Sequence, residues 1–422
     1  MTENVNNYEI YLVGGAVRDE LLGLKPSERD WVVVGSSPGQ MLDQGFKIVG
    51  RNFPVFLHPQ TNEEYALART ERKSAPGHKG FEFQTSPSTS LEDDLKRRDL
   101  TINAIAKSSS GEIIDPYFGR LDISNRILRH VSPAFSEDPL RVLRVARFKS
   151  QFAQFDFSIA DQTLQLMTQL SASDELSTLT VDRVWKETEK ALLTTKPSLY
   201  FETLHQCGAL KIFFPGVDAL FGIPQRADYH PEIDSGIHTM MVLDRAAQLT
   251  TDIGVRFAAL THDLGKALTP HSQLPRHIGH EKRGLKPLAQ LFDRYPIPNK
   301  LKQTARLCCE HHLLMHKLHQ LRPETILKLI EKLDGFRRQH QVEQFILLCQ
   351  ADSQGRGGMQ DRAYPQANSL RAIFNDVMKI SAADLTDSKL KGPQIGKAIK
   401  KLRLDKIREF LRSHDKKKSA AG

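Results

Sequence analysis

Two carboxylates stand one residue apart in the N-terminal part of the chain, shortly after a pair of glycines. Glu28 and Asp30 open the apolar run DWVVVG, and Gly14-Gly15 end the earlier run EIYLVGG. Side chains at i and i+2 of a strand point to one face, so the two carboxylates can hold a divalent metal together. Mg²⁺ prefers hard oxygen ligands, and glycines let backbone N–H groups approach phosphates closely. The pattern therefore favours a nucleotide site over a solvent-facing acidic pair in a hairpin.

Two further residues near this pair can serve the same chemistry. Glu64, in the run NEEYALARTERK, is a third carboxylate on what reads as a neighbouring strand. An ion pair of Glu64 with Arg69 or Lys73 is an equally good interpretation. Arg18 follows the glycines in the predicted helix AVRDELLG, where its guanidinium can form paired hydrogen bonds with phosphate oxygens.

The motif RRDLTINA brings more charged groups, including Arg97 and Asn103. Arg98 can reach phosphates, and Asp99 can accept a hydrogen bond from a ribose hydroxyl. A helix start with mixed charges is the simpler interpretation. It is disfavoured because both arginines precede an apolar helix instead of lying along its exposed face. We expect that helix within LEDDLKRRDLTINAIA.

The run SEDPLRVLRVARF predicts a helix with Ser136 as its N-cap. Asp138, Arg141 and Arg144 recur every three residues and so fall near one face. An Asp beside an Arg presents an acceptor next to donors, which matches the amine and bare ring nitrogen of cytosine and adenine but not guanine or uracil. A weak surface ion pair is the alternative interpretation.

A second group of residues with metal-binding chemistry lies in the middle of the chain. His238 lies in one predicted helix, and His262-Asp263 ends another in VRFAALTHDLGK. Imidazole is a good ligand for transition metals, and an adjacent carboxylate can bridge metal and water. Further candidates follow along the chain: His277, His280, His312, His316 and Asp352. Scattered surface histidines would explain any single one of these, but not the His-Asp pair at the end of an apolar helix.

The elements that must position these residues form two regions. From Tyr8 to about Tyr117, short β-rich runs alternate with turns, which predicts a mixed α/β unit. From Ser136 onward the apolar spacing is helical almost throughout. The C-terminal run KAIKKLRLDKIREFLRSHDKKK predicts a basic helix, either a solvated surface or a contact for a phosphate backbone.

Composition narrows the function classes. The net charge of +9 over 422 residues favours an anionic partner such as nucleic acid. No run approaches the apolar length needed to cross a bilayer, so we expect no membrane association. The four cysteines form no C-x-x-C pair, which predicts reduced thiols in a cytoplasmic protein.

The successive motifs LVGGAVRDELLG, EEYALARTERK, RRDLTINA, DPYFGRLD and EDPLRVLRVARF resemble those of the class II tRNA nucleotidyltransferases, the CCA-adding enzymes. The resemblance covers the chain from about Tyr8 to Gly222. It implies an α+β protein with a polymerase-β-like nucleotidyltransferase head followed by an all-α neck, body and tail. The expected boundaries are 1–135 for the head, 136–224 for the nucleotide-selecting neck, 225–340 for the body and 341–422 for the basic tail.

The resemblance also implies roles for single residues. Glu28 and Asp30 would bind catalytic Mg²⁺, and Asp138 and Arg141 would read the base without a template. The residue pattern itself offers Glu64 as the third catalytic carboxylate. The expected contacts to ATP or CTP are Gly15, Arg18, Arg98, Asp99, Arg144 and Arg147. One departure concerns Glu28, because the family usually has Asp there. Glu is one methylene longer but still a hard oxygen donor, so we expect activity with a shifted metal.

The central histidines resemble the HD phosphohydrolase superfamily, with its ordered H…HD…D ligands. This resemblance implies His238, His262, Asp263 and Asp352 as metal ligands, with His280 and His312 as further candidates. A transition metal such as Ni²⁺ is expected. CCA-adding enzymes of one bacterial group carry this domain, which implies phosphatase, 2′-nucleotidase and 2′,3′-cyclic phosphodiesterase activities.

The expected function is therefore addition of C, C and A to the tRNA 3′ end from CTP and ATP by a cytoplasmic monomer or weak homo-oligomer. Three alternatives remain. A bacterial poly(A) polymerase shares the head motifs but usually lacks the HD residues. A nucleotide-sensing HD hydrolase would have a degenerate head. The intact E-x-D, RRD and EDPLR motifs argue against that alternative. An RNA-binding protein would use only the basic tail.

Overall fold

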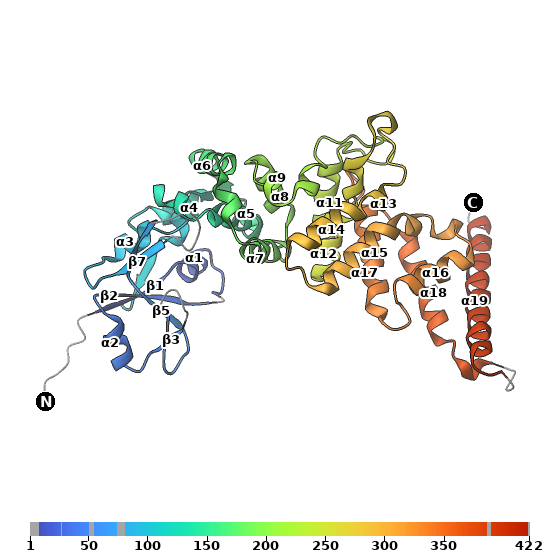
Figure 1. Cartoon of the computed structure of the whole chain (residues 1–422), viewed down its shortest axis with the longest axis horizontal. Coiled ribbons are helices and arrows are strands. Elements are labelled where there is room, and N and C mark those ends of the chain that lie inside the picture. The colour runs from blue at the N-terminus through green and yellow to red at the C-terminus, as the bar shows by residue number, and fades with distance from the viewer. Residues whose placement is uncertain (1–7, 27, 50–54, 74–80, 386–389, 421–422) are drawn as a thin grey trace. The chain divides into compact units, whose positions relative to one another are not determined.

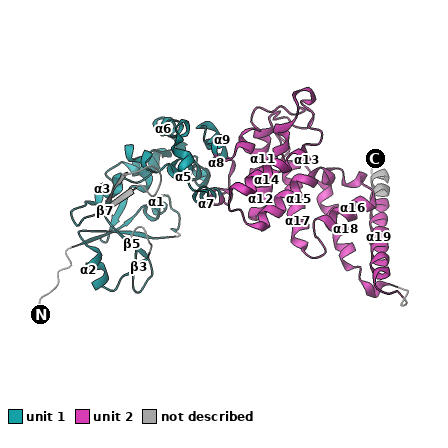
Figure 2. Ribbon diagram, viewed as in Figure 1, with its two compact units in different colours: residues 1–188, 199–212 teal, residues 189–198, 213–422 magenta. Residues whose placement is uncertain are grey.

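The computed structural model describes residues 8–26, 28–49, 55–73, 81–385 and 390–420. The chain divides into two compact units, which Figure 2 shows in separate colours. Unit 1 comprises Met1–Thr188 and Leu199–Ile212, and unit 2 comprises Glu189–Ser198 and Phe213–Gly422. The mixed unit followed by helices that the sequence predicts is confirmed. The finer division into four domains stays a prediction.

Unit 1 contains the β-structure of the described residues, shown in blue and cyan in Figure 1. Within those residues a seven-stranded sheet has the order β3-β4-β5-β2-β1-β8-β9. The strands of this sheet are β1 (Glu9–Val13), β2 (Asp30–Val34), β3 (Lys47–Val49), β4 (Val55–Leu57), β5 (Glu64–Leu67), β8 (Ala106–Ser108) and β9 (Ile113–Ile114). Two small sheets accompany it: antiparallel β6 (Arg69–Lys73) with β7 (Phe81–Thr85), and parallel β10 (Ile127–Leu128) with β11 (Ser158–Ile159).

The register of the central strands brings the predicted carboxylates together. Strand β2 is antiparallel to β1, with Val13 opposite Asp30, and parallel to β5, with Asp30 opposite Glu64. Val13 and Val32 are buried on the core face. The alternation of side chains along β2 thus fixes which residues face the core. The prediction that Glu64 lies on the adjacent strand is confirmed.

The turn after β1 depends on glycine. Gly14 has φ +70° and precedes helix α1 (Gly15–Leu21). A Cβ on Gly14 would lie 2.7 Å from Nη1 of Arg98. Only glycine therefore combines this backbone conformation with the close approach of the arginine.

The helix predicted over LEDDLKRRDLTINAIA is wrong in its second half. Helix α3 ends at Lys96, and Ala106 begins strand β8, which pairs with β1. Two local interactions end the helix. Buried Asp94 draws Arg97 and Arg98 back onto it, and Asp99 Oδ1 accepts from the N–H of Leu100 at 2.9 Å. The arginines therefore end a helix and do not precede one. The short helices of this region are α2 (Pro38–Asp43), α3 (Leu91–Lys96) and α4 (Gly119–Asn125).

The helical part of unit 1 centres on α5 (Leu140–Gln151), which begins directly after Pro139. The prediction of Ser136 as its N-cap is wrong, because Ser136 lies in a separate 3₁₀ turn, Pro133–Glu137. Proline at the cap starts the helix because it needs no N–H partner there. The neighbouring helices are α6 (Asp161–Ala172), α7 (Val181–Leu192), α8 (Ser198–Gln206) and α9 (Leu210–Phe213).

Unit 2 is helical, and at its centre α12 and α17 contact each other and both contact α11 and α15 (Figure 1). Its helices are α10 (Pro215–Asp218), α11 (Ser235–Leu249), α12 (Ile253–Thr261), α13 (His280–Arg283), α14 (Leu285–Arg294), α15 (Asn299–His316), α16 (Pro323–Lys332), α17 (Gln339–Gln354), α18 (Pro365–Lys379) and α19 (Pro393–Ala420). The basic helix α19 packs one side on α16 and α18, with Ile407 buried. Within the described ranges, no helix combines the length and apolar character that crossing a membrane requires.

Candidate active sites

The first site is a cavity of about 230 Å³ over the ends of β2 and β5. Charged residues from three segments line it: Asp30, Glu64, Arg69, Arg97 and Arg98. Carboxylates and guanidiniums therefore share one concave surface. This is the arrangement that a metal-bound polyphosphate needs, since it carries both a cation and negative oxygens.

The carboxylates of this cavity suit a hard cation. Burial raises the pKa of Asp30, Glu28 raises it further, and Arg98 opposes them. A divalent cation offsets the cost of ionising Asp30, because it favours the ionised form of a carboxyl group. Glu28 is exposed and precedes β2, so the strand geometry that predicted its direction does not apply to it. Carboxylate oxygens alone fit Mg²⁺, which keeps part of its shell for water and phosphate.

Arg98 is held against the glycine turn. Its Nη2 lies 3.1 Å from Oδ2 of Asp94, which is buried and also pairs with Arg97. Gly14 is thus the glycine whose missing side chain makes room for an arginine of the site. Predicted Gly15 is the first residue of α1, and a Cβ there would meet Arg18 Nη2 at 3.4 Å.

Arg18 is buried, with 5% of its surface exposed. Its Nη1 donates to Oδ1 of Asn103 at 2.5 Å, and its Nε and Nη2 donate to Asp19. The guanidinium also lies 5.2 Å and 4.8 Å from the ring centres of Phe148 and Phe152. In this structure Arg18 thus links α1 to α5, and it does not line the cavity of Asp30.

Two more predicted nucleotide contacts lie in ion pairs. Arg144 Nε donates to Asp99 Oδ2 at 2.8 Å. Burial would raise the pKa of Asp99, but Arg144 and the amide of Asn103 outweigh it and lower that pKa. Arg147 Nε donates to Glu187 Oε2 at 2.5 Å. Asp99 therefore stays an ionised acceptor, and both arginines are oriented by carboxylates.

The charged partner of Asp138 is Arg183 on α7, at 2.7 Å between Nη2 and Oδ2. The hydrogen bonds described for Arg141 go to the carbonyl oxygens of Ala134 and Arg97, each at 2.5 Å. Sequence reasoning did not single out Arg183. The apolar spacing of VDRVWKETEKALL marks a helix but does not tell which polar residue faces α5.

The second site gathers the predicted HD residues in unit 2, and all of them are buried. Two groups of predicted residues have their ligand atoms within 4.8 Å of one another: His238, His262 and Asp352, and Asp263, His280 and His312. A third group of this kind joins His230 and Glu232 to His238. Within the part of the chain that the structure describes, groups of three such ligands lie in unit 2 only. The less certain candidates His280 and His312 thus join the same site as the four core ligands.

Backbone carbonyls fix the direction of these histidines. Nδ1 of His262 lies 2.9 Å from Ala259 O, and Nδ1 of His280 lies 2.7 Å from His277 O. Nδ1 of His312 lies 3.0 Å from Cys308 O. A carbonyl only accepts, so each Nδ1 carries the proton and each Nε2 presents a lone pair. Nε2 of His262 is buried and makes no hydrogen bond among the described residues, as expected of a metal ligand.

Asp263 lies between the two groups. Its Oδ2 is 3.2 Å from His262 Nε2 and 2.6 Å from Lys266 Nζ, while its Oδ1 is 3.0 Å from His280 Nε2. Burial would raise the pKa of Asp263, but His262 and Lys266 lower it well below the usual range. One ionised carboxylate can therefore serve two neighbouring cations. A mixed imidazole and carboxylate set suits a transition metal better than Mg²⁺.

Other residues support the ligands. Nδ1 of His238 lies 2.9 Å from Oε1 of Glu232, a residue that sequence reasoning missed because a loop carries it. His316 Nε2 lies 2.7 Å from Asp352 Oδ2, and Tyr364 Oη lies 3.0 Å from His316 Nδ1. Partners of this kind orient metal ligands. The sequence indicated that His316 lies beside His312, because residues four apart share one face of a helix.

The HD residues open into a cavity of about 410 Å³. Cationic side chains line it beside the ligands: Arg226, Lys266, Arg276, Lys317 and Arg356. His277 also lines it, with its ring nitrogens on Thr269 and Pro224. A positive cavity around a metal-ligand cluster suits an anionic substrate such as a phosphate ester.

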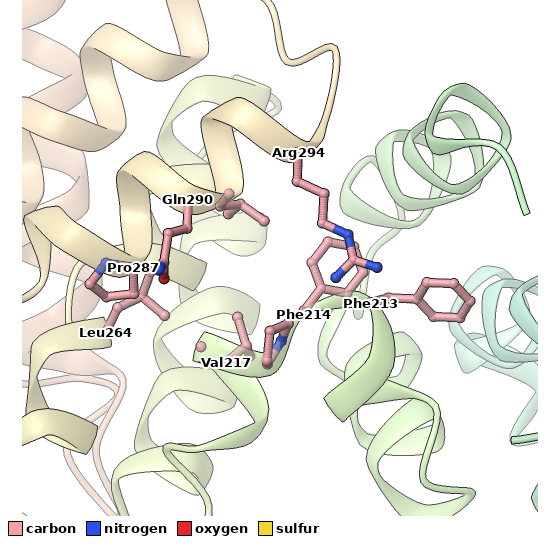
Figure 3. Close-up of a pocket in the computed structure, with 10 residues that line it drawn as sticks. Phe213, Phe214, Val217, Leu264, Pro287, Gln290 and Arg294 are labelled. Atoms are coloured by element: carbon pink, nitrogen blue, oxygen red, sulfur yellow. The ribbon is translucent and has the colours of Figure 1, made fainter. Parts of the chain in front are cut away.

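A separate apolar cavity of about 350 Å³ lies between α10, the turn at Leu264 and α14 (Figure 3). Figure 3 shows Phe214, Val217 and Leu264 at this cavity, with Arg294 beside them. The described residues that line it carry no carboxylate, imidazole or thiol. It therefore has no group for acid–base or metal chemistry.

Comparisons with known proteins match the regions of the chain that contain both sites. The family model of the poly A polymerase head domain matches residues 10–129. The model of the probable RNA and SrmB- binding site of polymerase A matches residues 156–221, and the HD domain model matches residues 236–336. The multifunctional CCA protein of Acinetobacter baumannii is 54% identical over 96% of this chain and 98% of its own length. That of Thioalkalivibrio sulfidiphilus is 53% identical over 95% and 98%.

Solved structures share the fold. A CCA-adding enzyme in its apo form II has a TM-score of 0.65 at 20% identity, covering 97% of this chain and 91% of that one. The Thermotoga maritima CCA-adding enzyme complexed with tRNA_CCA has a TM-score of 0.62 at 19% identity, covering 96% and 90%. The predicted α+β fold, with a polymerase-type head followed by helices and an HD domain, is confirmed.

Proposed function

The chain belongs to the multifunctional CCA protein family, and from this premise we propose that unit 1 adds C, C and A to the 3′ end of tRNA from CTP and ATP. The chain is a nucleotidyltransferase that carries an HD domain. One observation carries the proposal furthest. The register of β2 and β5 sets Asp30 opposite Glu64 in a cavity that also holds Arg98.

Each residue of the head has a proposed task. Asp30 and Glu64 hold Mg²⁺, with Glu28 reaching in from the loop before β2. When bound, this ion supplies charge neutralisation on the transferred phosphate. Arg98 binds the triphosphate beside the Gly14 turn, and Gly15 offers the first N–H of α1 to it.

The helical part of unit 1 completes the nucleotide site in this proposal. Asp99, Arg144 and Arg147 form its wall, and Arg18 supports that wall from α1. Asp138 and Arg141 select the base. Solved relatives in complex with ATP, CTP or tRNA share this fold, which supports the choice of partners. A cytoplasmic location and a monomer or weak homo-oligomer belong to the same proposal.

For the HD domain we propose phosphohydrolase activity on phosphomonoesters, 2′-nucleotides and 2′,3′-cyclic phosphates. His238, His262, Asp263 and Asp352 hold a transition ion such as Ni²⁺, and Asp263 can share a second ion with His280 and His312. When bound, these ions supply Lewis-acid polarisation of the phosphate and its attacking water. The orphaned Nε2 of His262 supports the assignment. Lys266 and Arg356 bind the phosphate oxygens and hold the substrate in place.

The head is tested by single-nucleotide addition to a tRNA transcript that lacks its last three residues. We expect two residues from CTP alone and completion when ATP is added. Long tracts from ATP with no use of CTP would identify a poly(A) polymerase. Binding without Mg²⁺-dependent pyrophosphate release would leave an RNA-binding protein.

The HD site is tested with protein stripped of metal by a chelator and reloaded with single ions. We expect 2′,3′-cyclic AMP hydrolysis to return with Ni²⁺ and to stay low with Mg²⁺. Nucleotide addition should show the opposite preference in the same samples. Equal recovery of both activities with Mg²⁺ would contradict the transition-metal assignment.

A further inference from the structure

We propose that Arg183 on α7 is a specificity-determining residue of the nucleotide site, which acts by positioning Asp138. The inference rests on the proposed function, since it assumes that Asp138 reads the incoming base. The inference adds helix α7 to the base-selecting site. Neither the sequence motifs nor the matched family models connect this helix with base selection. Arg183 lies 45 positions after Asp138 in the chain.

The carboxylate of Asp138 is held at both oxygens. Arg183 Nη2 donates to Oδ2 at 2.7 Å, and the N–H of Leu140 donates to Oδ1 at 3.1 Å. Two donors on different oxygens fix the rotation of the carboxylate. Each oxygen can accept a second hydrogen bond, and a quarter of each side chain in this pair stays exposed. Asp138 is therefore both oriented and open to a ligand.

This orientation has a chemical consequence for base choice. An ionised carboxylate only accepts, so it suits the exocyclic amines of cytosine and adenine. A carboxylate that rotates away no longer meets the amine, and the preference for cytosine and adenine over uracil and guanine is lost. The hydrogen bond from Arg183 to Oδ2 opposes that rotation. Arg183 thereby turns Asp138 into a selective acceptor.

Two further observations connect α7 with the nucleotide site. Glu187, one turn after Arg183 on the same helix face, accepts from Arg147 Nε at 2.5 Å. Helix α7 thus orients two of the predicted nucleotide contacts. Nη1 of Arg183 is buried and has no hydrogen-bond partner among the described residues. A buried donor without a partner is costly, and the bare ring nitrogen of an incoming cytosine or adenine would satisfy it.

The test compares kcat/KM for CTP, UTP, ATP and GTP in Arg183→Met and Arg183→Lys. Loss of a charge-assisted hydrogen bond predicts a fall of roughly 10- to 100-fold in kcat/KM for CTP and ATP. UTP and GTP should fall much less, so the CTP:UTP ratio drops at least about tenfold. The lysine variant keeps the charge and should recover part of the ratio. Lys186→Met, on the exposed side of α7, is the matched control and should match wild type.

A double variant separates positioning from a general structural role. If Arg183 acts through Asp138, adding Arg183→Met to Asp138→Asn changes the CTP:UTP ratio no further. An equal fall for all four nucleotides in Arg183→Met, or an additive change of the ratio in the double variant, would overturn the proposal. HD hydrolysis in the same samples checks that the variants are folded. Wild-type protein that adds neither C nor A would instead show that the proposed function itself is wrong.

Discussion

Oε1 of Glu232 lies 2.9 Å from Nδ1 of His238, on the side of the ring away from the other HD ligands. Nε2 of the same ring lies 3.2 Å from Oδ1 of Asp352. A carboxylate near Nδ1 favours a proton on that nitrogen, which would leave Nε2 as the atom that binds a metal in the proposed HD site. Glu232 therefore lies where its charge can orient the ring of His238.

The first prediction follows from this pair. Glu232→Gln keeps the shape but removes the charge that orients His238, so affinity for Ni²⁺ should fall by about 10- to 100-fold. Titration of chelator-stripped protein by calorimetry measures it. Asp361→Asn, an exposed carboxylate of unit 2, serves as control. Equal affinity in the Glu232 variant and wild type would remove Glu232 from the metal site.

The second prediction concerns the ligands themselves. His262→Ala and Asp263→Ala each remove a ligand atom, so hydrolysis of 2′,3′-cyclic AMP should fall by at least about a hundredfold. CCA addition should persist, because the head carboxylates lie in unit 1. Both activities are measured on one preparation. Unchanged hydrolysis in either variant would contradict the assignment of that residue.

Much of the head could be predicted from the sequence because its signals are local. The run EIYLV, the glycine turn and the following helix are fixed by side-chain alternation and backbone freedom over a few residues. The pairing of β2 with β5 is a longer-range contact. A common cation for Asp30 and Glu64 was one of two interpretations of Glu64 that the sequence offered, and the structure sets the two residues opposite each other.

The end of α3 could not be predicted in the same way. Residues after Lys96 have helical spacing, but the buried carboxylate of Asp94 pairs with both arginines and the chain then turns at Asp99. The side of β1 that faces away from β2 also needs a partner strand, and that partner is β8, which begins at Ala106. These are tertiary demands that outweigh local propensity.

The partners within the sites were the least predictable part. Arg141 follows Asp138 by three residues, which made it the expected partner. The ion pair that the structure describes instead joins Asp138 to Arg183 of another helix. Glu232 lies in a loop with no periodic pattern to mark it. Residue type and spacing predict which groups can do chemistry, but the groups that orient them come from elements far away in the chain.

The third prediction removes the head activity and leaves the HD activity, the converse of the second prediction. Asp30→Ala removes the carboxylate at the centre of the head cavity, so CTP and ATP addition should fall by about 10²–10³-fold. HD hydrolysis and Ni²⁺ affinity should stay near wild type. Equal loss of both activities in a folded protein would show that the two sites are not independent.

The fourth prediction concerns pH. Burial lowers the pKa of His312 from 6.5 to about 3. Below pH 6.5 the unfolded chain therefore binds a proton at this residue that the folded chain does not. The free energy of unfolding accordingly falls as the pH is lowered from 6.5 to about 3. The contribution is at most about 1.4 kcal/mol per pH unit and vanishes above pH 6.5.

Melting curves of chelator-treated protein at pH 7.5 and pH 5 measure this effect. His312→Asn cannot take up the proton, so its melting temperature should drop less between the two pH values than that of wild type. The comparison uses the drop and not the absolute melting temperature, because the substitution itself perturbs the core. Identical drops would mean that folding does not lower the pKa of His312.

The last prediction concerns how the head chooses bases. Asp138→Ala removes the acceptor for the exocyclic amine of cytosine and adenine and leaves Arg183 without its carboxylate. A lost hydrogen bond to a charged group is worth roughly 1.5–3 kcal/mol, so discrimination against UTP and GTP should weaken by about ten- to a hundredfold. Catalysis by Asp30 and Glu64 should remain. Single-nucleotide incorporation with all four triphosphates measures it, and an equal slowing of all four would mean that Asp138 only supports the start of α5.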